Sequence, residues 1–138
     1  TFVASNIYWN PTGVIFQLEW IPLLLNSDRA AFQARIRKEV PQFQIFAFQG
    51  SNRVERPLNY SSLYFPITYA SPRMDSLLGL DLNDDVEGPS IFRAFESGLP
   101  ASSGLFDARV TDPILIQEFR GFNKLMGIYF PLYTTING

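Results

Sequence analysis

The stretch Tyr64–Leu82, "YFPITYASPRMDSLLGLDL", joins an apolar strand, a turn and a short helical segment. The apolar run Tyr64–Tyr69 predicts the strand, and "SPR" at 71–73 predicts the turn. The apolar residues of "MDSLL" predict a helical turn before "LGLDL" resumes an extended pattern. Binding clefts often lie where a strand gives way to a helix, yet the stretch holds no His or Cys to act as base or nucleophile. It therefore favours binding over catalysis.

The composition predicts one folded domain. The chain has 138 residues, of which 46% are hydrophobic and 15% aromatic, so it can bury a substantial core and is not intrinsically disordered. Its formal net charge is −2, and only Lys38 and Lys124 are lysines. Because nucleic-acid binding depends on clustered basic residues, we expect no nucleic-acid partner.

Cysteine and histidine are both absent. Their absence removes disulfides, thiolate nucleophiles, the commonest general base and most transition-metal sites. We therefore expect no cofactor, no metal and no catalytic residues in this domain. The longest apolar run, from Val14 to Leu25, is too short for a membrane span and contains Glu19.

Strands and helices are predicted on both sides of the opening stretch. Residues 14–21 alternate in polarity and predict a strand. One face of this strand carries Phe16, Leu18 and Trp20, and the other face carries Gln17 and Glu19. A helix is expected to begin with Ser27 as its N-cap and to end before Pro41. Phe32, Ile36 and Val40 recur at helical spacing and should face the core.

The remaining pattern predicts a further helix and several strands. Residues 43–49 predict a strand with a turn at 50–52, and residues 53–62 a polar loop. A helix with Pro89 in its first turn should end at Gly98. Residues 101–106 predict a strand, and 114–119 and 125–133 a hairpin. These elements indicate an α+β fold with a mixed, mostly antiparallel sheet and flanking helices.

The carboxylates at 81–87 allow several interpretations. Asp84, Asp85 and Glu87 are typical of a solvated loop. Asp81 lies between apolar residues, as an outward or hydrogen-bonded side chain at a strand end. A hydrolase using Asp81 and Glu19 is an alternative, and it would need the two carboxyls about 5–9.5 Å apart in an open cleft.

Seven fragments resemble the CHASE domain family in their order along residues 16–133. They are "LEWIP", "DRAAFQARIRKEVPQFQIF", "YFPITYASP", "LGLDL", "AFESG", "DPILIQE" and "YFPLY". The resemblance looks like that of a bacterial member. It implies an extracytoplasmic sensory domain of a transmembrane receptor whose output module is a histidine kinase, a nucleotide or cyclic-di-GMP cyclase, or a phosphodiesterase.

The resemblance also implies a domain plan. The family fold is an N-terminal helix followed by two PAS-like subdomains. We expect one CHASE-like domain over 1–138, with an N-terminal segment at 1–13, a membrane-distal PAS-like part at 14–100 and membrane-proximal strands at 101–138. The domain would be periplasmic in an inner-membrane receptor, held to the membrane through flanking transmembrane helices, and the receptor would act as a homodimer.

Three positions depart from the plant branch of the family, which binds cytokinins. A ligand-pairing Asp of that branch aligns with Pro72, which offers no side-chain donor or acceptor. A pocket leucine aligns with the larger Phe92, and a pocket threonine with Ser103, which keeps the hydroxyl. The first two changes argue against an adenine-type ligand.

We expect an unidentified small molecule to bind between the sheet and residues 64–82. The predicted lining residues are Phe46, Phe48, Tyr69, Pro72, Arg73, Phe92 and Ser103. Arg73 could meet an anionic ligand or be a surface charge after the turn. The alternative is a structural or dimerisation spacer domain whose pocket is filled.

Overall fold

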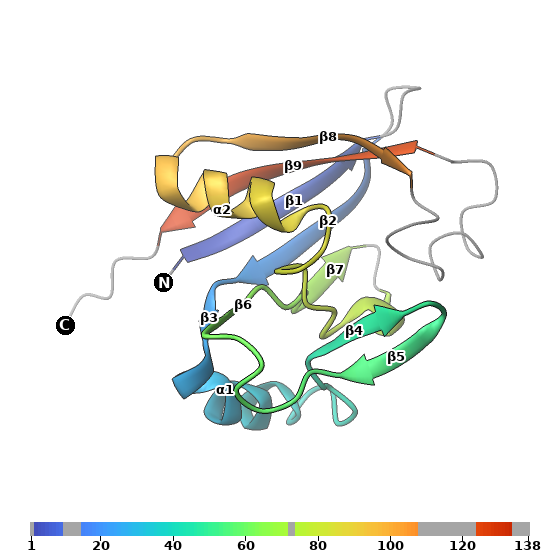
Figure 1. The fold of residues 1–138 in the computed structure, drawn as a ribbon, viewed down its shortest axis with the longest axis vertical. Coiled ribbons are helices and arrows are strands. Elements are labelled where there is room, and N and C mark those ends of the chain that lie inside the picture. The colour runs from blue at the N-terminus through green and yellow to red at the C-terminus, as the bar shows by residue number, and fades with distance from the viewer. Residues whose placement is uncertain (1, 10–14, 72–73, 108–123, 134–138) are drawn as a thin grey trace.

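The computed structural model describes residues 2–9, 15–71, 74–107 and 124–133 (Figure 1). Its elements are β1 (Phe2–Trp9), β2 (Ile15–Pro22), β3 (Leu24–Leu25), the 3-10 helix η1 (Asn26–Asp28), α1 (Arg29–Ile36), β4 (Phe46–Gln49), β5 (Asn52–Glu55), β6 (Leu63–Tyr64), β7 (Tyr69–Ser71), the 3-10 helix η2 (Asp75–Leu77), α2 (Gly88–Ser97), β8 (Ala101–Asp107) and β9 (Lys124–Tyr133). The predicted α+β class is confirmed.

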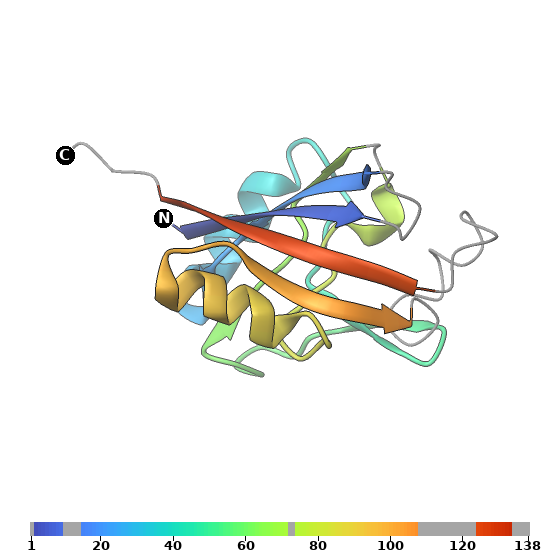
Figure 2. The ribbon, with the colours of Figure 1, turned by 90° about the horizontal axis from the view of Figure 1, so that it is seen from above.

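The largest layer is a five-stranded sheet in the order β7-β2-β1-β9-β8. Every neighbouring pair is antiparallel. β1 and β9, which come from the two ends of the chain, lie side by side in the middle of the sheet. Helix α2 packs along β8 and β9 (Figure 2). This helix begins and ends where Pro89 and Gly98 predicted.

A second group of elements lies beside this sheet and contains α1, the β3–β6 pair and the β4–β5 hairpin (Figure 1). Residues 64–82 connect the two groups. The predicted strand Tyr64–Tyr69 is divided into β6 and β7, and Pro66, which lacks an N–H, lies between them. The extended "LGLDL" segment forms single bridges, from Leu80 to Phe46 and from Asp81 to Pro66.

The N-terminal residues 2–9 form a strand, where the resemblance to the family implied a helix. β1 pairs with β2 along one edge and with β9 along the other. Its sequence, "FVASNIYW", is rich in the aromatic and β-branched residues that favour strands. Residues 114–119, predicted as half of a hairpin, lie outside the described residues, and β9 pairs with β1 and β8.

Two local predictions also differ from the structure, and the structure decides which face of β2 is buried. The N-cap of α1 is Asp28 rather than Ser27, and no side chain caps the helix. β5 occupies part of the predicted loop 53–62, because residues 52–55 pair with β4 across the turn at Gly50. On β2 the polar face is the buried one: Glu19 is 2% exposed, whereas Trp20 is 40% exposed.

The core beneath residues 64–82 is filled with apolar side chains. Its buried members include Phe43, Ile45, Phe46, Phe65, Ile67, Leu77, Leu78, Leu80 and Leu82. Gly79 has a φ of +96°, and a Cβ placed there would lie 2.0 Å from the carbonyl oxygen of Gln44. The chain therefore needs glycine at 79, both for its backbone conformation and for this close approach.

Candidate functional site

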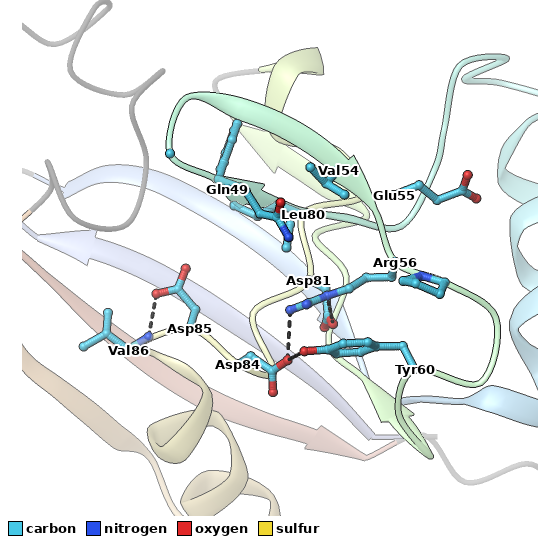
Figure 3. Close-up of a pocket in the computed structure, with 14 residues that line it drawn as sticks. Gln49, Val54, Glu55, Arg56, Tyr60, Leu80, Asp81, Asp84, Asp85 and Val86 are labelled. Atoms are coloured by element: carbon cyan, nitrogen blue, oxygen red, sulfur yellow. Dashed lines mark hydrogen bonds and ion pairs between the residues drawn. The ribbon is translucent and has the colours of Figure 1, made fainter.

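A cavity of about 690 Å³ opens between the β4–β5 hairpin and the loop at 80–86 (Figure 3). Its volume lies within the roughly 300–1,000 Å³ that small-molecule sites typically occupy. The lining residues are Ala47, Phe48, Gln49, Gly50, Val54, Glu55, Arg56, Pro57, Tyr60, Leu80, Asp81, Asp84, Asp85 and Val86. The wall thus combines apolar side chains with one guanidinium and several carboxylates.

Arg56 is the centre of the charged wall. Its Nε lies 3.3 Å from Oδ2 of Asp81, and its terminal nitrogen Nη2 lies 3.1 Å from Oδ2 of Asp84. The guanidinium also stacks 4.3 Å from the ring centroid of Tyr60, whose hydroxyl donates to Oδ2 of Asp84 at 2.7 Å (Figure 3). One cation therefore holds two carboxylates and an aromatic ring in fixed positions.

Asp81 is buried at the inner end of this cluster and is 2% exposed. Its Oδ1 accepts hydrogen bonds from the backbone N–H groups of Phe65, at 2.9 Å, and Asn83, at 3.2 Å. Burial raises the pKa of Asp81 above its ordinary value, although these hydrogen bonds and the charge of Arg56 oppose that shift. The interpretation of Asp81 as a hydrogen-bonded side chain is thus the one the structure supports.

Arg29, the first residue of α1, fixes the backbone on which Arg56 stands. Its buried guanidinium donates to the carbonyl oxygens of Arg56, at 2.6 Å, and Pro57, at 2.9 Å. It also donates to the hydroxyl of Tyr64 at 3.3 Å and lies over that ring. Helix α1 is therefore joined directly to the cavity wall.

A second polar cluster lies beneath the five-stranded sheet. The hydroxyl of Tyr129 on β9 donates to Oε1 of Glu87, the N-cap residue of α2, and both side chains are buried. Burial raises the pKa of Tyr129 well above its ordinary value, and the negative charges of Glu87 and Glu19 raise it further. This bond ties the start of α2 to the sheet.

The sequence-predicted site residues are distributed over several elements. Phe46 and Phe48 lie together, with ring centroids 5.4 Å apart, and Phe48 lines the cavity. Tyr69 on β7 and Ser103 on β8 belong to opposite edges of the sheet, so four strand spacings, roughly 19 Å, separate their strands. Phe92 is exposed on α2. Ser103 accepts a hydrogen bond from the N–H of Gly127 at 2.8 Å.

Two of the predicted lining residues, Pro72 and Arg73, lie outside the described residues. The structure therefore joins Phe46 and Phe48 and does not bring Tyr69, Phe92 and Ser103 to them. Sequence reasoning missed Arg56 and Tyr60, because they stand in a polar segment that was read as a connecting loop. The turn residues that begin at Gly50, between "FAFQ" and "NRVE", are the signal that could have indicated a β-hairpin here.

The described part of the chain has neither a membrane-spanning helix nor a cluster of metal-binding side chains. No helix there is long and apolar enough to cross a membrane. No group of three or more His, Cys, Asp or Glu residues is arranged there to hold a metal ion. The polar groups that are in place, around Arg56, are suited to hydrogen bonding and charge pairing with a ligand.

Comparisons with known proteins identify the family. The CHASE domain family matches residues 1–137. The chain is also similar to "Adenylate cyclase, germination specific" from Dictyostelium discoideum, with 38% identity over 84 residues, which is 56% of this chain and 10% of that protein. The chain thus spans about a tenth of the length of this curated relative. No solved structure matches significantly. The chain belongs to the CHASE domain family, whose members are extracellular sensory domains of membrane receptors.

Proposed function

We propose that this domain binds a small molecule in the cavity beneath the β4–β5 hairpin and transmits the binding event to the rest of a membrane receptor. The observation that carries the proposal is the cavity of about 690 Å³ whose wall holds the buried Asp81 against Arg56, within a sensory family. In this arrangement Arg56 pairs with Asp81 and Asp84, and the proposal is ligand binding without catalysis.

Transmission requires a ligand that favours one of two conformations, since equal affinity for both shifts nothing. The contacts of Arg29 with the carbonyls of Arg56 and Pro57 give a route from the cavity wall to α1. We propose that the receptor's output module is a kinase or a nucleotide cyclase. A bacterial origin, a periplasmic location and a dimeric receptor are part of the same proposal.

A thermal-shift screen of purines, amines, amino acids, organic acids and lipids tests the binding. A ligand at 100 times its Kd adds about 2.7 kcal/mol to the free energy of unfolding, which raises Tm by about 5 to 15 °C in a domain of this size. Val54→Trp should place an indole ring in the cavity, occupy part of the space that the ligand needs, and reduce or abolish the shift. Leu58→Trp, at a site that is 74% exposed and does not line the cavity, should preserve it.

A ligand-free spacer domain is the second candidate function, and one observation favours it. The space beneath residues 64–82, where the sequence analysis expected the ligand, is filled by buried apolar side chains. If no compound in the screen raises Tm, the spacer is favoured over the sensing cavity. If compounds raise Tm but Val54→Trp leaves every shift unchanged, the ligand binds outside this cavity and the proposed site is refuted.

A further inference from the structure

The wall of the cavity carries more negative than positive charge. Among its lining residues, Glu55, Asp81, Asp84 and Asp85 are acidic and Arg56 is basic. Glu55 pairs with Arg29 at 3.9 Å, so the surplus beside Arg56 comes from Asp81, Asp84 and Asp85. Arg56 already lies between Asp81 and Asp84, at 3.3 and 3.1 Å. An anionic ligand would have to draw Arg56 away from both carboxylates, whereas a cation would meet the surplus of negative charge.

Two carboxylate oxygens of the wall retain capacity to accept hydrogen bonds. Oδ2 of the buried Asp81 accepts none from a described residue, and its contact with Arg56 is an ion pair. Asp84 uses Oδ2 for both Tyr60 and Arg56, which leaves its Oδ1, on a side chain that is 48% exposed, to face a ligand. Both carboxylates contact one guanidinium, so an ammonium that binds the free oxygen of Asp84 would also lie near the negative charge of Asp81.

The rest of the wall is suited to an apolar group. Phe48, Val54, Leu80 and Val86 contribute aliphatic and aromatic surface. A ligand with a short apolar body would remove this surface from water, which is favourable in proportion to the area buried. The cavity thus offers an apolar region beside a region that favours positive charge.

We propose that the ligand of this cavity is a small organic cation, a primary amine on a short apolar or aromatic group, whose ammonium binds the half-exposed carboxylate of Asp84. This inference rests on the proposed function, because it names the ligand class of the same cavity. The ammonium adds donors where the wall has spare acceptors, and Arg56 keeps its place beside Tyr60.

Three probes of matched size and different charge test the class. Phenethylamine is a cation, 2-phenylethanol is neutral and 3-phenylpropionate is an anion at pH 7. Isothermal titration calorimetry should give phenethylamine a Kd at least about tenfold lower than that of the alcohol, and no measurable binding of the acid. Equal or tighter binding of the alcohol or the acid would overturn the amine class while leaving a ligand-binding cavity in place.

Matched variants locate the ammonium. Asp84→Asn keeps the shape of the half-exposed side chain and should weaken phenethylamine binding by about 10- to 100-fold, with no change for 2-phenylethanol. Glu96→Gln removes one negative charge on the exposed surface of α2, away from the lining residues, and should leave Kd unchanged. Equal effects of the two variants would overturn the site. If the thermal-shift screen yields ligands while no amine binds, the amine class fails and the proposed function stands.

Discussion

The two sides of residues 64–82 differ in how they are packed. On one side Phe65, Ile67 and Leu77 are at most 1% exposed and fill the space between the sheet and α1. On the other side Leu80 and Asp81 form the wall of an open cavity. The apolar side is stabilised by close packing, and the charged side by the ion pairs of Arg56 with Asp81 and Asp84. The same segment therefore supplies both part of the packed core and part of the cavity wall.

The largest effect should come from Gly79→Ala, which disturbs the packed side. The new Cβ would lie 2.0 Å from a backbone oxygen of Gln44, at a φ of +96°. Left-handed strain and overpacking together should lower the free energy of unfolding by about 4 to 6 kcal/mol. Gly50→Ala is the matched control, because Gly50 also has a positive φ, of +62°, with nothing within 4 Å of the Cβ position. It should cost about 1 kcal/mol in urea unfolding, and equal costs would contradict the close approach.

The packed side can also be tested by removing volume from it. Leu77→Ala deletes a side chain that is 1% exposed and should lower the free energy of unfolding by about 3 to 4 kcal/mol. The measurement is urea denaturation followed by circular dichroism. A loss below about 1 kcal/mol would mean that this side is as loosely packed as the cavity, and the comparison would fail.

Local signals in the sequence account for the elements that were predicted well. Pro89 and Gly98 mark the ends of α2 because they act on the backbone of their own residues. The alternation in residues 14–21 likewise predicts the strand that the structure forms as β2. It does not reveal which face of β2 is buried, because that depends on what packs opposite. Glu19 is inside because it shares the space beneath the sheet with Tyr129 and Glu87.

The candidate site was harder to predict, because its residues come from segments that are distant in the sequence and meet only in the tertiary fold. Phe48 was identified because an aromatic residue on a short strand commonly lines a cavity or a core. Arg56 gains its role from Asp81 and Asp84, which belong to a later loop. No local pattern connects a polar loop at 53–62 with an acidic one at 81–87, so their meeting is a property of the tertiary fold.

The contribution of Asp81, which lies between the two sides, to the free energy of unfolding should depend on pH. Burial raises the pKa of Asp81 in the folded state, so the folded protein binds this proton more tightly than the unfolded chain does. The contribution of Asp81 to stability therefore falls as pH rises from about 4 through its folded pKa. Asp81→Asn removes this titration. The free energy of unfolding of the wild type, minus that of the variant, should decrease between pH 3.5 and 7 in urea titrations. A difference that grows with pH would show that Arg56 outweighs burial.

The smallest effect should come from Val54→Ala, on the cavity side. Val54 lines the cavity and is 37% exposed, so the deleted methyl groups were never fully removed from water. Its loss should cost less than about 1 kcal/mol and should enlarge the cavity without weakening the core. When both variants are measured in the same urea series, the difference between their costs in free energy of unfolding compares the packing of the two sides directly. A cost for Val54→Ala approaching that of Leu77→Ala would mean that the hairpin closes onto residues 80–86 in solution. The cavity would then be packed in the absence of ligand, and any ligand would have to open it.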